Sequence, residues 1–196
     1  MTKHLILVGG AAGTGKTTTA GTIAAELRVG WLQLDSVWIA LRAAASPGSD
    51  ERETLDIDGR LRRGTETSDK LLTAHVAAAS AVCRVLPAVL AFELQTHETL
   101  VADGAWVLPD AVAGLGLVDT KISAIFLHEP DLEALRRSMR SRRGSSPVQP
   151  WHHTSSEVAW HYGNWVAEKA TQHGMAVISA RPFDTLHNRV RELVTR

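Results

Sequence analysis

Short, mainly apolar segments alternate along the chain with longer segments in which apolar residues recur every three or four positions. The short segments are typical of strands that are buried on both faces of a parallel sheet. They predict five strands, near residues 5–8, 31–35, 99–103, 122–127 and 175–178. The alternation of strand and helix predicts a three-layer, doubly wound α/β fold with a parallel sheet, in a single domain that spans residues 1–196.

The segments with helical periodicity place helices between and after these strands. They are expected near residues 17–28, 67–96, 109–116, 131–139, 155–173 and 184–194. Pro87 is expected either to kink the second of these helices or to start another one, because proline lacks a backbone N–H. Ser155 or Ser156 is expected to cap the helix that ends near residue 173. The Arg-, Gly-, Ser- and Pro-rich segment 140–150 is expected to be a mobile loop.

Composition narrows the class of protein. The 196 residues are 44% hydrophobic, which is ordinary for a globular domain with a buried core. The 21 basic residues balance 21 acidic ones, so no net field attracts nucleic acid or anionic lipid. Cys83 has no second cysteine to pair with and lies in an apolar run, so we interpret it as a packing residue. We expect a cytoplasmic protein, monomeric or homodimeric, with no nucleic-acid or membrane partner.

The most specific motif lies between the first predicted strand and the first predicted helix. Its residues are Gly10, Ala11, Ala12, Gly13, Thr14, Gly15, Lys16 and Thr17, followed by Thr18. The spacing G-x-x-x-x-G-K-[ST] in this context is typical of a phosphate-binding loop. Its glycines turn backbone N–H groups toward phosphate oxygens, and the helix N-terminus adds partial positive charge. Lys16 would bridge the β- and γ-phosphates and Thr17 would bind Mg²⁺, which predicts ATP and Mg²⁺ as cofactors.

Two carboxylates end neighbouring predicted strands. Asp35 ends the second strand and Asp103 ends the third. Ligands of open α/β sheets bind beyond the carboxyl ends of the strands, so both side chains are expected to face the phosphates. Asp35 is interpreted as a general base or as the group that holds the acceptor hydroxyl. Asp103 is assigned to Mg²⁺ together with Thr17. The alternative for each carboxylate is simply to cap the helix that follows.

A cluster of arginines precedes the predicted loop 140–150. Arg136, Arg140 and Arg143 share one helical face, while the apolar residues of the same helix point to the core. In a protein of zero net charge, such a cluster indicates neutralisation of the transferred phosphoryl group. The alternative is a solvated flank of the helix.

The chain resembles the P-loop small-molecule kinases of the nucleoside monophosphate kinase-like group, which include gluconate, shikimate and 2-phosphoglycerate kinase-like proteins and chloramphenicol phosphotransferase. The segments that carry the resemblance are residues 10–18, 32–38, 100–109, the arginine-bearing helix and residues 180–185. The resemblance implies the strand order 2-3-1-4-5, a helical acceptor-side insertion at about 37–97 and an arginine-rich lid at about 136–155. It also implies that Arg181 and Pro182 contact adenine.

The resemblance implies ATP-dependent transfer to a hydroxyl or phosphate, but it leaves the acceptor open between an antibiotic, a sugar acid and a nucleoside-like compound. Trp38 and Trp106 each follow a carboxylate by three residues and either wall the acceptor site or pack in the core. Arg60 either binds an anionic acceptor or is solvated. His152, His153 and His161 lack the spacing of a zinc site. The alternative function is a P-loop NTPase or nucleotide-sensing switch without a small-molecule acceptor.

Overall fold

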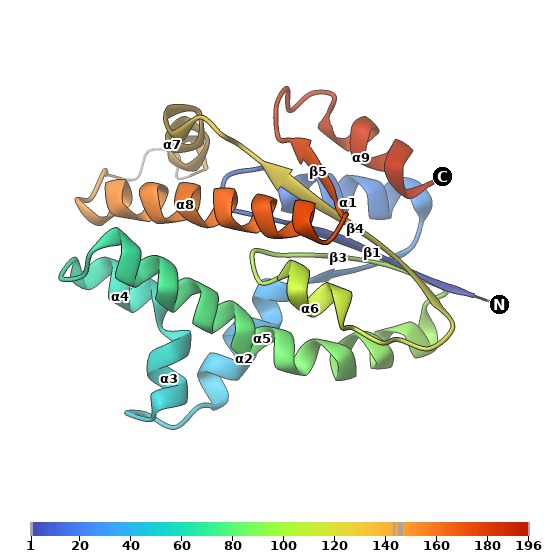
Figure 1. Ribbon diagram of the computed structural model, residues 1–196, viewed down its shortest axis with the longest axis horizontal. Coiled ribbons are helices and arrows are strands. Elements are labelled where there is room, and N and C mark those ends of the chain that lie inside the picture. The colour runs from blue at the N-terminus through green and yellow to red at the C-terminus, as the bar shows by residue number, and fades with distance from the viewer. Residues whose placement is uncertain (1, 143, 145–146, 196) are drawn as a thin grey trace.

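A computed structural model describes residues 2–142, 144 and 147–195 of the chain (Figure 1). Its strands are β1 (Lys3–Gly10), β2 (Gly30–Gln33), β3 (Thr99–Asp103), β4 (Thr120–His128) and β5 (Ala176–Ser179). All four neighbouring pairs are parallel, and the order is β2-β3-β1-β4-β5. The predicted fold class and strand order are therefore confirmed.

Helices cover both faces of this sheet (Figure 1). They are α1 (Lys16–Leu27), α2 (Leu34–Ala44), α3 (Asp50–Leu55), α4 (Ile57–Arg63), α5 (Ser68–Thr96), α6 (Pro109–Ala113), α7 (Leu132–Ser141), α8 (Trp151–Gln172) and α9 (Leu186–Val194). Helices α1 and α9 lie on one face, while α5 and α8 lie on the other. The short helices α2 to α4 extend from the α5 side, in the segment predicted to be the acceptor-side insertion.

The alternation of side chains along β1 divides the core into two layers. Ile6 and Val8 face α1 and α9, where they pack with residues such as Ile23 and Val190. Their neighbours in the strand, of which Leu7 is one, belong to the larger cluster under α5 and α8. Because both faces of the strand are covered, residues 5–8 of β1 are all apolar, which is why the sequence shows a continuous run there rather than an alternating one.

Helix α5 is the longest helix described. By length and composition alone it would be able to cross a membrane. A core helix of a water-soluble domain passes the same test, and α5 contributes Leu71, Val82 and Leu90 to the main core cluster. Its composition therefore follows from its place against the sheet.

Several predicted boundaries differ from the observed ones. Helix α5 continues through Pro87, which lies on its exposed side, so a kink there would cost no core contact. Helix α8 begins at Trp151, so neither Ser155 nor Ser156 caps it; Ser156 instead bonds to carbonyls of the preceding turn. Strand β2 ends at Gln33, and Asp35 lies in the first turn of α2.

Candidate active site

The predicted phosphate-binding loop is built on glycines that adopt positive φ angles. Gly10, Gly13 and Gly15 have φ of 126°, 86° and 85°, a region that side-chain-bearing residues rarely occupy. A Cβ on Gly10 would lie 2.3 Å from the carbonyl oxygen of Leu127, and one on Gly13 would lie 2.8 Å from Met139 Cγ. The loop is thus closely packed between β4 and α7, and its shape depends on these glycines.

Lys16 opens α1 and is only 7% exposed. Its Nζ donates a hydrogen bond of 2.6 Å to the Ala11 carbonyl within the loop. Burial lowers the pKa of Lys16 to about 8, the charges of Asp103 and Asp35 oppose that shift, and Arg142 adds to it. Two carboxylates and a second cation therefore act electrostatically on this ammonium.

Asp103 is buried, and both of its oxygens are hydrogen-bonded. Thr17 Oγ1 donates to Oδ2 at 2.8 Å, and Trp31 Nε1 donates to Oδ1 at 2.9 Å. Burial raises the pKa of Asp103, while the two hydrogen bonds and the charge of Lys16 act in the opposite direction. A hydroxyl and a carboxylate at the start of α1 are the two oxygen ligands that the sequence assigned to Mg²⁺.

Asp35 reaches the same end of the sheet from the first turn of α2, and its side chain is exposed. Its Oδ1 accepts a hydrogen bond of 2.7 Å from Trp106 Nε1. Trp38 stacks on Trp106 with ring centroids 4.9 Å apart. The structure therefore brings together Asp35, Trp38 and Trp106, which the sequence predicted to share the acceptor side.

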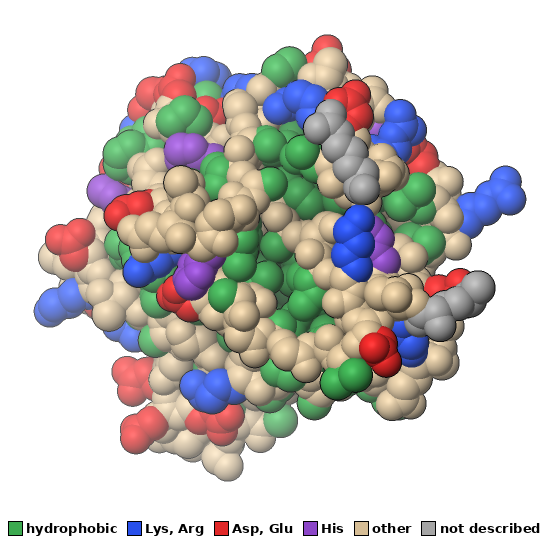
Figure 2. Space-filling model, turned by 45° about the vertical axis from the view of Figure 1, so that its right-hand side comes forward, with side chains coloured by type: hydrophobic (Ala, Val, Ile, Leu, Met, Phe, Trp, Pro, Cys, Tyr) green, Lys and Arg blue, Asp and Glu red, His purple; other side chains and the backbone are tan. Residues whose placement is uncertain are grey.

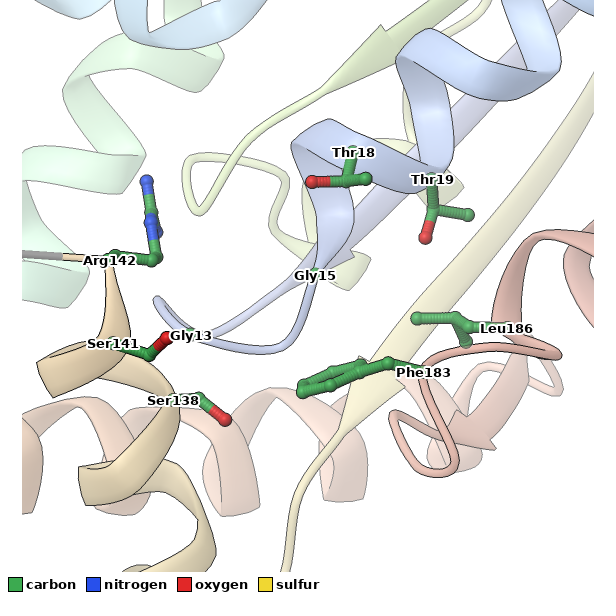
Figure 3. A pocket seen from close by; sticks show the side chains of 9 residues that line it. All are labelled: Gly13, Gly15, Thr18, Thr19, Ser138, Ser141, Arg142, Phe183 and Leu186. Carbon is green, nitrogen blue, oxygen red and sulfur yellow. The ribbon is translucent and has the colours of Figure 1, made fainter. Parts of the chain in front are cut away.

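A cavity of about 300 Å³ opens on the other side of the phosphate loop. It is lined by Gly13, Gly15, Thr18, Thr19, Ser138, Ser141, Arg142, Phe183 and Leu186 (Figure 3). In Figure 3 the ring of Phe183 points toward the loop from the segment after β5, while Arg142 stands on the α7 side. The cavity is therefore walled by an aromatic ring and a cation at opposite ends.

The predicted lid arginines do not lie together in this cavity. Arg136 is paired with Glu133 and, at 2.7 Å, with Glu157. Arg140 lines a separate cavity on another side of α7, together with Arg136. Arg143 lies outside the described residues. Arg142, which the sequence interpretation did not select, is the α7 arginine that lines the cavity beside the loop.

Two further predicted contact residues have partners within the protein. Arg181 donates to Glu129 Oε2 at 2.5 Å and to Ser138 Oγ at 2.7 Å, and its guanidinium lies 4.7 Å from the ring centre of Phe183. It therefore fastens the segment after β5 to α7, while neighbouring Phe183 lines the cavity. Arg60 is paired with Glu66 in the acceptor-side segment.

His75 was not identified from the sequence. Its ring lies 5.3 Å from Trp106 and 4.2 Å from Tyr162. Burial and the charge of Lys16 lower the pKa of His75 to about 4, so the ring is neutral. A lone histidine in an apolar helix gives no sequence signal that its ring packs against Trp106 near the site. Among the described residues, no three His, Cys, Asp or Glu side chains converge as a metal cluster, and this includes His152, His153 and His161.

Solved structures of small-molecule kinases share this architecture. A gluconokinase from Sinorhizobium meliloti 1021 superposes with a TM-score of 0.60 at 15% identity, over 99% of this chain and 90% of that one. A shikimate kinase from Acinetobacter baumannii, solved with shikimate, gives 0.58 at 14% identity over 99% and 94%. A sugar kinase from Janibacter sp. HTCC2649 gives 0.57 at 18% identity over 100% and 95%.

The chain therefore has the fold of the P-loop small-molecule kinases. At these identities the similarity establishes the fold and does not determine the acceptor. No protein-family model and no curated protein matches the sequence.

Proposed function

We propose that this protein transfers the γ-phosphoryl group of ATP to a hydroxyl of a small molecule, with Mg²⁺ as the metal ion. The observation that carries the proposal is the convergence of four groups at one end of the sheet. Lys16 and Thr17 open α1, Asp103 reaches Thr17 from the end of β3, and Asp35 acts on the same Lys16 ammonium from α2. A phosphate cradle, a metal-binding pair and a carboxylate on the acceptor side are the parts that a hydroxyl kinase requires.

The nucleotide would bind with its triphosphate in the glycine loop and with its base and ribose in the cavity beyond that loop. The triphosphate would be held by the loop N–H groups, the N-terminus of α1 and the Lys16 ammonium. The cavity of about 300 Å³ beyond the loop suits the base and ribose, with the Phe183 ring available for stacking. Thr18 lines this cavity as well. Arg181 and Pro182 would then support the base through Phe183.

The Thr17 hydroxyl and the Asp103 carboxylate fit Mg²⁺, which usually takes one or two protein oxygens and fills its remaining positions with water and phosphate. They are 2.8 Å apart and hydrogen-bonded to each other. Trp31 would keep its hydrogen bond to Asp103 Oδ1, while the metal or its water would replace the hydrogen bond between Thr17 and Oδ2. When bound, Mg²⁺ would neutralise charge on the β- and γ-phosphates.

Asp35 would accept the proton of the acceptor hydroxyl while that oxygen forms a bond to the γ-phosphorus and ADP leaves with the bonding electrons. Trp106 occupies Oδ1 of Asp35. Among the described residues no hydrogen bond engages Oδ2, so this oxygen faces the acceptor side with a free lone pair. Arg142 would stabilise the charge on the transferred group.

The test is to incubate the pure protein with ATP and Mg²⁺ and a panel of hydroxyl compounds, and to search by mass spectrometry for products heavier by HPO₃. The panel contains gluconate, shikimate, phosphoglycerate, nucleosides and aminoglycosides. Lys16→Ala is expected to reduce transfer by roughly 10³-fold or more without unfolding the protein. Lys70→Ala removes an exposed lysine of α5 and serves as the matched control. Equal transfer by Lys16→Ala and wild type would rule the proposal out, and hydrolysis of ATP without any phosphorylated product would favour the NTPase alternative.

A further inference from the structure

The indole of Trp106 is held in place by groups from three different helices. Its ring lies between Trp38 of α2 and His75 of α5, with centroids at 4.9 and 5.3 Å. The Cys83 thiol of α5 donates to the backbone carbonyl of Trp106 at 3.0 Å. Tyr162 of α8 donates to the carbonyl of Ala105, the preceding residue. These contacts leave the indole 5% exposed, with little freedom to rotate.

The polar atom of this fixed ring is directed at Asp35. Trp106 Nε1 donates to Asp35 Oδ1 at 2.7 Å, although the two residues are 71 positions apart. Asp35 itself is exposed and lies at the start of a helix, where nothing else described hydrogen-bonds its carboxylate. The rotamer of Asp35 is therefore determined by a buried side chain of another element.

From this geometry we infer that Trp106 is a positioning residue, which fixes the Asp35 carboxylate so that Oδ2 faces the acceptor hydroxyl. The inference rests on the proposed function, because it assumes that Asp35 receives the proton. It replaces the interpretation of Trp106 as an aromatic wall: a ring that is 5% exposed offers almost no face to a ligand, whereas its N–H reaches the carboxylate.

An anchored donor matters here because general-base catalysis depends on geometry. A carboxylate on a freely rotating side chain spends part of its time in unproductive rotamers, and a hydrogen bond from a rigid partner removes them. The donor also selects which oxygen remains available, as the orienting partner of a catalytic base does in other enzymes. His75 packs against Trp106 as an uncharged ring. Because its pKa is lowered, His75 does not add a second cation, besides Lys16, near Asp35.

Trp106→Phe tests the inference, because it keeps the ring in the stack and removes only the N–H. Turnover is followed as ADP formation from ATP and Mg²⁺, with the acceptor found by the panel or with water as acceptor. We expect a roughly 10-fold lower kcat, an unchanged KM for ATP, and no further loss when Trp106→Phe is added to Asp35→Asn. Trp160→Phe, which removes an N–H that donates to the Pro130 carbonyl, is the matched control and should retain wild-type turnover.

The inference would be overturned if Trp106→Phe had the kcat of wild type, or if it lowered kcat by the same factor in the Asp35→Asn background. Either result would leave the kinase proposal standing. An inactive wild-type protein would overturn the proposed function itself.

A second measurement does not depend on turnover or on the folding of Trp106→Phe. In protein labelled with ¹⁵N-tryptophan, Asp35→Ala should move the Trp106 indole N–H resonance upfield and accelerate its exchange with solvent. An unchanged resonance and exchange rate would show that the hydrogen bond is absent in solution.

Discussion

The phosphate-loop side and the acceptor side of the site are built in different ways. On the phosphate side, Gly10 to Thr17 form one continuous segment whose geometry is determined by local glycines and by the start of α1. On the acceptor side, Asp35, His75 and Trp106 come from three elements and meet through side-chain contacts. The first arrangement is encoded in a run of adjacent residues, while the second exists only after the chain has folded.

Under the proposed function, this difference separates what the protein shares with kinases of the same fold from what distinguishes it. The loop must grip the same triphosphate in every protein that uses it, so its spacing is constrained by the ligand. The acceptor side must fit a particular molecule and is built from helices α2 to α5, where short segments are joined by exposed turns. Charged side chains of both signs are scattered over the face shown in Figure 2, without a basic field of the kind that nucleic-acid binding requires.

The largest effect is expected at the carboxylate that links the two sides. Asp35→Asn keeps the shape of the side chain and a possible hydrogen bond from Trp106, but it removes the proton acceptor. We expect kcat to fall by roughly 10²–10⁴, with ATP affinity within about 3-fold of wild type. Steady-state kinetics and calorimetry with ATP and Mg²⁺ measure the two quantities.

Asp58→Asn is the matched control, since Asp58 is an exposed aspartate near the start of α4 in the same acceptor-side segment. If Asp35→Asn turned over as fast as wild type, Asp35 would serve only to bind Trp106. Asp35 would then no longer be the group that links the acceptor side to the phosphate side.

The strands and the phosphate loop were predicted from local patterns, while the strand order was predicted from the family resemblance. The predicted arginines were chosen from another face of the helix than the one beside the phosphate loop. Arg136 and Arg140 share a face of α7 that lines a separate cavity. Arg142 directly follows α7, keeps helical φ and ψ of −64° and −22°, and lies four positions after Ser138, so it shares the face of Ser138 and Ser141 that lines the cavity beside the loop.

Contacts between residues that are far apart in the sequence were the second feature that could not be predicted. Nothing in the sequence links Trp106 to Asp35 or to His75, because each contact requires α2 and α5 to pack beside the segment after β3. Asp103 was predictable for the opposite reason. It ends a strand that pairs directly with β1, and the register places it beside Val8, just before the loop.

Arg142 gives the second prediction, with an intermediate effect. Arg142→Gln removes the cation that acts on Lys16 and lines the nucleotide cavity. We expect a loss in kcat of roughly 10–10²-fold, because a charge-assisted contact to the transferred group would be lost. Arg137→Gln is the matched control, since Arg137 is an exposed arginine of the same helix. A larger loss for Arg140→Gln than for Arg142→Gln would instead support the original helical-face hypothesis and indicate that the end of α7 rearranges around the nucleotide.

The smallest effect concerns pH and tests the phosphate side alone. Burial lowers the pKa of Lys16 to about 8, so its ammonium loses its proton within an accessible pH range. Only the protonated form attracts a triphosphate, so affinity should fall as pH rises through that value and should not fall below it. If binding requires the protonated form of Lys16, the affinity for ATP should be about 10-fold lower at pH 9 than at pH 7.

The measurement is calorimetric titration with ATP and Mg²⁺ from pH 7 to pH 9.5, and Lys16→Arg is the control. A guanidinium stays protonated throughout this range, so the variant should bind with an affinity that barely changes with pH, whatever its absolute strength. Bound phosphate favours the charged lysine, which moves the midpoint in the complex above that of the free protein. A wild-type affinity as independent of pH as that of Lys16→Arg would mean that the buried ammonium does not hold the triphosphate, and the phosphate side would then owe its affinity to the loop amides and the N-terminus of α1.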